Sequence, residues 1–199
     1  MDKKKQEHDH EPLHAPMIMG YAESYVKMSK ARSIFLSENI TKKVGTELSA
    51  LLLYYDHIDH EEPISIYIHT NGGDSDGLSN IYDVMQMIRA PIKTILLGKC
   101  YSAGAFILAA GTKGERYALP SAKVMIHGVQ FGFPIPGQST IENSNYFGFV
   151  EQTNDTLMKI LAKHTGHTLV NMKKFCEREM WMSSLEAVRF GLIDWIFEN

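Results

Sequence analysis

The residue best placed to do chemistry is Ser102. It stands where a β-rich apolar run, Ile92 to Leu97 followed by Gly98, gives way to a helix-forming run that begins at Ala103. The first N–H groups of a helix have no acceptor within the helix, and the helix dipole favours negative charge there. A serine at this junction lies beside donors for an oxyanion, as acyl transfer requires. Serine is also a common helix N-cap, however, and Cys100 occupies the first glycine position of a G-x-S-x-G elbow.

A serine needs a base to accept its proton, and the base needs a third group to hold its tautomer. Of nine histidines, His127 is the best candidate, because it ends an apolar strand just before a glycine and would lie near the sheet edge that carries Ser102. A buried structural histidine is the alternative. His69 is a rival base, since it ends the strand before Gly72 and Gly73. Those glycines form either a simple turn or a place where a substrate carbonyl approaches backbone N–H groups.

Two other histidine-containing segments offer possible metal ligands. His8, His10 and His14 lie in a polar N-terminal stretch interrupted by prolines, and residues 56–62 form a polar cluster rich in aspartate, glutamate and histidine. A flexible tail and the end of a surface helix are ordinarily solvated. We therefore expect no metal site.

The composition indicates one soluble domain. A chain of 199 residues with 44% hydrophobic content closes one sizeable core. Its net charge of −3, with no basic run beyond residues 3–5, argues against a nucleic-acid partner. No apolar run is long enough to span a bilayer, and the two cysteines form neither a disulfide framework nor a metal-ligand spacing. We expect no membrane contact and a cytoplasmic location.

The elements that must position Ser102 form two successive strand–glycine loop–helix units, which predict an α/β fold with largely parallel strands. The loops then open at the same, carboxyl-terminal edge of the sheet, where such folds place their sites. The N-terminal half is predicted to contain a short strand at 34–36, a helix capped by Thr41 that runs to about His57, and a strand from Ile64 to His69. A helix that opens at Asp74 or Ser75 and is stopped by Pro91 follows, and then the strand and helix that flank Ser102.

The C-terminal half is predicted to hold short strands around an extended segment and a long helix. An unpaired face on so long a helix often meets another subunit. The predicted elements are strands at 116–119 and 123–127, an extended segment at 128–138, a helix from Thr140 to His164 stopped by Gly166, helices at 170–175 and 184–190, and a strand at 192–197.

Several sequence blocks, in consistent order from about Ser24 to Phe197, resemble the ClpP family, the proteolytic subunits of the Clp protease (peptidase family S14). Ordered blocks are far more specific than a single motif. They are Ile66–Ile68 with Gly72–Gly73, Ile81–Gln86, Ser102–Gly111, Arg116–Pro120, Val124–His127, Leu161–Gly166, and Met182–Ser183 with Glu186–Val188 and Gly191–Asp194.

Carried over residue by residue, the resemblance implies that Ser102 is the nucleophile and His127 the general base. It assigns the oxyanion hole to the backbone N–H groups of Gly73 and Ala103. The triad aspartate of the family falls on Glu179, whose carboxylate lies one methylene further out. Triads on other folds accept either acid.

The resemblance also implies a ClpP/crotonase-like fold of repeated β-β-α units with a protruding strand–helix handle. Residues 24–199 would form the protease domain, and residues 1–23 a flexible tail, axial loop or propeptide. Family members assemble as two stacked heptameric rings, a tetradecamer. An AAA+ unfoldase of the ClpX, ClpA or ClpC type feeds unfolded polypeptides into them. ATP belongs to that partner, and this chain is expected to need no cofactor, since it has no phosphate-binding loop.

Three departures from the family pattern lie near the site. His69-Thr70-Asn71-Gly72-Gly73 replaces the usual Asn-Ser-Pro-Gly-Gly, Val129 replaces a proline, and residues 131–137 carry a short insertion. Two alternatives to an active protease remain open: a weakly active or non-catalytic ring subunit that assembles with an active paralogue, and an acyl-CoA-binding enzyme of the related crotonase superfamily. The pairing of Ser102 with His127 argues against the second.

Overall fold

The computed structural model describes residues 23–132 and 134–197. The expectations for the N-terminal tail, including its three histidines, lie outside these residues. The described chain begins with a helical segment, residues 23–30, that leads into the first strand.

A single sheet forms the centre of the molecule, in the order β1-β2-β3-β4-β7 with all neighbours parallel. Two further strands extend it: β5 pairs in parallel with the end of β3, and β6 pairs antiparallel with β5. The expected α/β fold with largely parallel strands is confirmed. The strands are β1 (Ser33–Leu36), β2 (Ile64–Thr70), β3 (Ile92–Tyr101), β4 (Arg116–Ala118), β5 (Lys123–Ile126), β6 (Met180–Ser183) and β7 (Trp195–Ile196).

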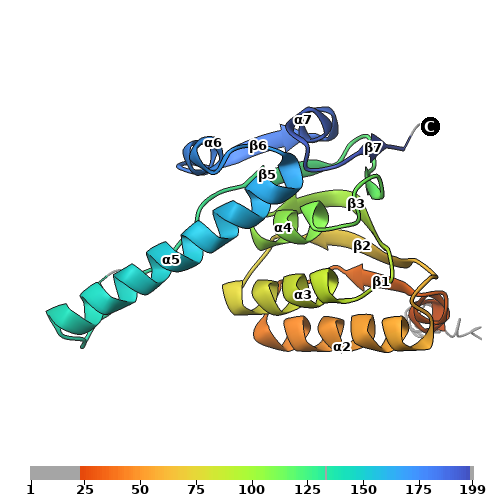
Figure 1. Cartoon of the computed structure of the whole chain (residues 1–199), viewed down its shortest axis with the longest axis horizontal. Coiled ribbons are helices and arrows are strands. Elements are labelled where there is room, and N and C mark those ends of the chain that lie inside the picture. The colour runs from red at the N-terminus through yellow and green to blue at the C-terminus, as the bar shows by residue number, and fades with distance from the viewer. Residues whose placement is uncertain (1–22, 133, 198–199) are drawn as a thin grey trace, which may run out of the picture.

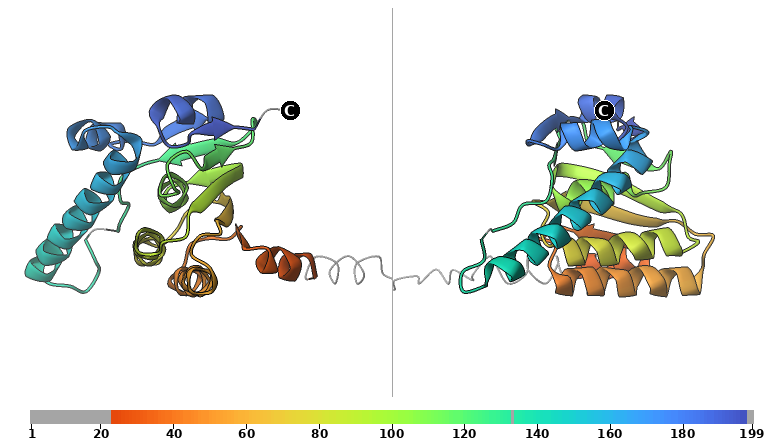
Figure 2. Two further views of the ribbon diagram at one scale, coloured as in Figure 1. Left: turned by 45° about the vertical axis from the view of Figure 1, so that its right-hand side comes forward. Right: turned by 60° about the vertical axis from the view of Figure 1, so that its left-hand side comes forward.

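The helices α2, α3 and α4 lie in a row on one face of this sheet, while α5 protrudes from the body together with the segment before it (Figure 1, Figure 2). Large aliphatic side chains of the strands and of this row are fully buried between the two layers. The helices are α2 (Lys42–Ile58), α3 (Ser75–Met87), α4 (Ala103–Ala109), α5 (Thr140–Thr165), α6 (Leu169–Phe175) and α7 (Ser184–Phe190).

Capping residues and small residues fix where these helices begin and how closely they pack. The Thr41 hydroxyl accepts the N–H of Val44 at the start of α2, and the Asp74 carboxylate accepts two N–H groups at the start of α3. Between the two helices, a Cβ added at Gly45 would lie only 2.7 Å from the Cα of Gly77. The sequence therefore brings α2 and α3 into backbone contact, which aligns the loop that precedes α3.

Two strand boundaries and one whole strand differ from the sequence prediction. Strand β3 runs through Gly98 to Tyr101, because its pairing with β2 shifts register after Ile68 and resumes at Thr70, opposite Cys100. The last strand is only two residues long, rather than spanning 192–197. Strand β6 was not predicted, although its antiparallel pairing with β5 proves important for the site.

A buried ion pair connects the end of the chain to the sheet. The guanidinium of Arg116 donates to Asp194 at 2.8 and 2.6 Å and to the carbonyl of His164 at 3.0 Å. The same carboxylate accepts the backbone N–H of Gly114 at 2.8 Å. These contacts tie β4, the end of α5 and the segment before β7 together. Within the described chain, no helix is long and apolar enough to cross a membrane.

Candidate active site

Ser102 occupies a strained backbone position between β3 and α4. Its φ and ψ of 52° and −126° place a non-glycine residue in a region that costs about 1–3 kcal/mol. Its N–H donates to the carbonyl of Met125 at 2.8 Å, which ties the junction to β5. The side chain forms no cap hydrogen bond. Ser102 therefore does not serve as a helix cap. The strained turn instead presents its hydroxyl at the junction of β3 and α4.

His127 is brought beside Ser102 by strand pairing. Tyr101 at the end of β3 is the register partner of Met125 in β5, so the residues just beyond both strands meet at one sheet edge. The imidazole is half-buried, and Nδ1 is hydrogen-bonded to the carbonyl of Gly128. A carbonyl only accepts, so Nδ1 must carry the proton, and Nε2 is left with the lone pair that a general base needs.

The two expected oxyanion donors also lie at this edge. The backbone N–H groups of Gly73 and Ala103 donate no hydrogen bond within the described part of the chain. Gly72 makes the close approach possible, because a Cβ there would lie 2.8 Å from the Cβ of Ser102 and 2.9 Å from the nitrogen of Ala103. Its φ of 92° is likewise one that favours glycine. The site thus has two N–H groups available to an oxyanion next to a serine hydroxyl.

Glu179 reaches the same site through β6. Ile126 is the partner of Met180, so Glu179 stands opposite His127 one position further on. The carboxylate of Glu179 accepts the indole N–H of Trp181 at 3.1 Å, and the Trp181 ring packs against Tyr101. Among the described residues, Glu179 makes no hydrogen bond with His127. Its role as the orienting acid stays a prediction.

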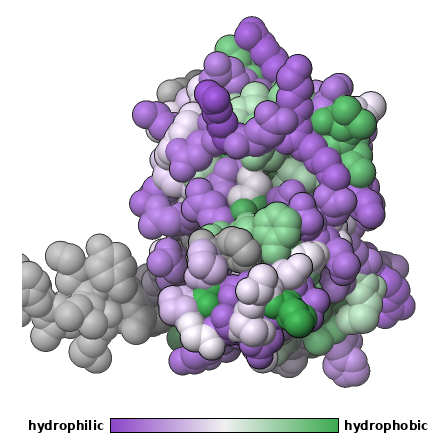
Figure 3. Space-filling view, turned by 90° about the vertical axis from the view of Figure 1, so that its left-hand side faces the viewer, coloured by the Kyte–Doolittle hydropathy of each residue, from purple (hydrophilic) through white to green (hydrophobic). Residues whose placement is uncertain are grey.

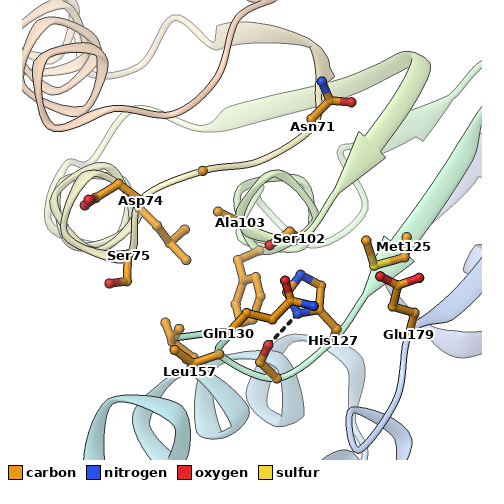
Figure 4. Close-up of a pocket in the computed structure, with 15 residues that line it drawn as sticks. Asn71, Asp74, Ser75, Ser102, Ala103, Met125, His127, Gln130, Leu157 and Glu179 are labelled. Atoms are coloured by element: carbon orange, nitrogen blue, oxygen red, sulfur yellow. Dashed lines mark hydrogen bonds between the residues drawn. The ribbon is translucent and has the colours of Figure 1, made fainter. Parts of the chain in front are cut away.

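These residues line one open cavity of about 510 Å³. In Figure 4 the imidazole of His127 lies between Ser102 and Glu179, and the dashed line marks its bond to the Gly128 carbonyl. The cavity continues between α3 and the segment after β5, where Asp74, Ser75, Gln130 and Leu157 line it. All five site residues expected from the sequence therefore border one cavity.

Other candidate residues are placed elsewhere. The ring of His69 packs against Gly98, 2.9 Å from where a Cβ would lie, and does not line the cavity. Burial raises the pKa of the Cys100 thiol, so this neighbour of Ser102 is an inert packing residue. In the polar cluster, the Asp56 carboxylate accepts the N–H groups of Arg89 and Ala90. No group of side chains suited to a metal ion occurs within residues 23–132 and 134–197.

Sequence reasoning missed two groups next to His127. One is the carbonyl of Gly128, a main-chain atom that no side-chain motif marks. The other is Asn154 on α5, whose Oδ1 accepts the N–H of Val129 at 3.0 Å. Val129 was the signal in the sequence that could have indicated Asn154. It stands where the family has a proline, so it carries a backbone N–H that needs an acceptor when it is buried.

The family model described as Clp protease matches residues 19–199, which is nearly the whole chain.

Proposed function

Because the chain belongs to the Clp protease family, we propose that it is the proteolytic subunit of an ATP-dependent Clp protease and a serine endopeptidase. The observation that carries this proposal is the convergence on one cavity of Ser102, His127 and two N–H groups that have no acceptor among the described residues. The resemblance found in the sequence and the α/β fold it implied are both in accord with the family match.

In the proposed reaction, Ser102 Oγ attacks the carbonyl carbon of a peptide bond while its proton passes to Nε2 of His127. Negative charge that develops on the carbonyl oxygen is stabilised by the N–H groups of Gly73 and Ala103. His127 then gives its proton to the leaving amine, and an acyl group remains on Ser102. A water molecule, deprotonated by the same imidazole, releases the second product. These steps use only groups of this chain, and ATP would be consumed by the partner unfoldase.

Two groups would stabilise the imidazolium that forms on His127. The Gly128 carbonyl accepts the Nδ1 proton, and Glu179 contributes a negative charge from the opposite strand. An extended substrate would lie along the segment after His127, where Gln130 lines the cavity and is exposed.

The proposed substrates are unfolded polypeptides, and the proposed assembly is two stacked heptameric rings served by an AAA+ unfoldase. Figure 3 views the molecule from the side toward which α5 protrudes. On this face, small apolar patches lie among the hydrophilic side chains. On α5 itself, Ile141 and Phe149 are 74% and 62% exposed. Large apolar side chains on a protruding helix fit a contact with another subunit.

The matched experiment compares the purified chain with its Ser102→Ala variant in hydrolysis of a fluorogenic peptide. The variant lacks the nucleophile but keeps the small side chain, so it should assemble normally and lose all hydrolysis above background. Equal hydrolysis by both proteins would refute the role of Ser102.

A non-catalytic ring subunit is the second candidate, favoured by one observation: the Glu179 carboxylate is bonded to Trp181 rather than to His127. This candidate, a weakly active or non-catalytic subunit that assembles with an active paralogue, predicts little or no hydrolysis of the peptide by either protein on its own.

A further inference from the structure

The segment that follows His127 is held from two sides by hydrogen bonds. The N–H of Gly128 donates to the carbonyl of Cys176, at the end of α6, at 2.9 Å. The N–H of Val129 donates to Oδ1 of Asn154, on α5, at 3.0 Å. Asn154 and Val129 are both half-buried. The protruding helix therefore contacts the main chain two residues from the proposed base.

The geometry of one peptide group connects Asn154 to His127. The carbonyl of Gly128 and the N–H of Val129 belong to the same planar peptide unit, in which they point in opposite directions. One end of that unit accepts the Nδ1 proton of His127, and the other donates to Asn154. A rotation of the plane that breaks one hydrogen bond also misdirects the other.

We propose that Asn154 is a positioning residue for the catalytic base: by holding the Gly128–Val129 peptide group, it keeps His127 in the tautomer and orientation that accept the proton of Ser102. This inference rests on the proposed function. It assigns to α5 a role in catalysis in addition to any contact between subunits.

The packing around Gly128 supports the same role. A Cβ at this position would lie 3.1 Å from Oδ1 of Asn154 and 3.2 Å from the carbonyl oxygen of Cys176. Both approaches are tighter than an ordinary van der Waals contact, so the peptide group fits closely between the two helices only because residue 128 has no side chain. Movement of Asn154 would therefore be passed directly to the peptide plane.

Only the oxygen of Asn154 takes part. Within the described residues its amide nitrogen makes no hydrogen bond, so aspartate keeps the required acceptor whereas leucine removes it at similar size. Gln152 lies two residues away on the same helix, is exposed, and makes no side-chain hydrogen bond in the described chain. It offers a matched control for a leucine substitution on α5.

The experiment measures kcat and KM for hydrolysis of a fluorogenic peptide by the full-length wild type, Asn154→Leu, Asn154→Asp and Gln152→Leu. Size-exclusion chromatography checks the assembly of each protein. We expect Asn154→Leu to lower kcat about 10- to 100-fold with little change in KM, because a misplaced base slows chemistry rather than binding. Asn154→Asp should stay within about threefold of wild type, and Gln152→Leu should equal it.

A second acceptor-deficient variant keeps the test decisive if leucine does not fold. Asn154→Ala should show the same loss of kcat, and the rate of Ser102 labelling by a fluorophosphonate should fall with it. Wild-type kcat in both Leu and Ala variants, or an equal loss in Asn154→Asp, would overturn the positioning role. If the wild type itself neither hydrolyses the peptide nor reacts with the probe, the proposed function fails, and this inference fails with it.

Discussion

At the scale of single residues, the site depends on main-chain atoms as much as on side chains. Ser102 is presented by a positive φ, and Gly72 allows the proposed oxyanion donors to approach it. Nδ1 of His127 bonds a backbone carbonyl, while the carboxylate opposite it on the neighbouring strand, that of Glu179, is bonded to Trp181. The proposed base thus bonds a neutral acceptor, with an acidic side chain available from the neighbouring strand.

This arrangement predicts a moderate effect of the substitution Glu179→Gln. Glutamine removes the negative charge that would stabilise the imidazolium but leaves the bond from Nδ1 to Gly128, so kcat/KM should fall about tenfold or less. The measurement is steady-state hydrolysis of a fluorogenic peptide. A loss of about a thousandfold or more would contradict it, because it would mean that Glu179 replaces the Gly128 carbonyl as the partner of Nδ1 during turnover.

At the scale of elements, the parallel strands could be predicted from the sequence and the antiparallel one could not. The apolar runs and glycine loops before α3 and α4 indicated two βα units, and Ser102 stood out at the second junction. Strand β6, by contrast, is only four residues long and ends on Ser183, which is also the cap of α7, so its sequence has no periodicity to detect. Its pairing with β5, which places Glu179 opposite His127, is a tertiary contact.

Two other features of the site also lay beyond local sequence patterns. The Gly128 carbonyl is a main-chain group whose direction is set by helices far along the chain, through Asn154 and Cys176. The indole of Trp181, which donates to Glu179, also packs against Tyr101 on another strand. Periodicity and spacing describe neighbours in sequence, whereas the contacts of Val129 with Asn154 and of Trp181 with Tyr101 join residues that are distant in it.

The contact between α5 and α3 contains a histidine that should make stability depend on pH. His164 Nε2 is 3.1 Å from the hydroxyl of Tyr82. Burial, with Lys163 and Arg116 nearby, lowers the pKa of His164 from the ordinary 6.5 to about 4. In the unfolded chain the ring takes up a proton near pH 6.5, whereas in the folded chain it does so only near pH 4. The contribution of His164 to the stability of the fold is therefore complete above pH 6.5 and is lost as the pH is lowered toward 4.

We therefore expect the free energy of unfolding of wild type to fall between pH 7 and 4.5 by about 1–2 kcal/mol more than that of His164→Gln. This value is smaller than the full pKa shift would give, because the ring is only half-buried and solvent screens its charge. Urea denaturation of both proteins at several pH values measures this difference. Parallel curves for the two proteins would show that His164 does not contribute to it.

At the scale of the whole molecule, a compact body carries the proposed site and α5 extends away from it (Figure 1). The helix has a capping box at Ser139 and ends at Gly166, so its length is set by its own sequence. Its tip carries exposed apolar side chains, and its middle contacts the segment after His127. An assembly that packs against α5 would thereby also contact the element that we propose positions His127.

The role of α5 in assembly gives a prediction for Phe149. Replacing this exposed ring by a carboxylate, in Phe149→Asp, places a charge in the proposed apolar contact and should separate stacked rings into single rings, which halves the native mass. Light scattering coupled to size-exclusion chromatography measures the mass, and Gln152→Asp on the same helix is the matched control. Unchanged mass for Phe149→Asp would contradict a subunit contact at this position.

The central claim is that Ser102 is an activated nucleophile. A fluorophosphonate probe tests it most directly, because it reacts with a serine whose proton a neighbouring base accepts and does not require the natural substrate. We predict that the purified wild-type chain gains one probe adduct, located at Ser102 by peptide mass analysis, and that Ser102→Ala and His127→Ala gain none. A wild-type chain that stays unlabelled under conditions that label an active serine protease, or one that is labelled at another residue, would contradict the account.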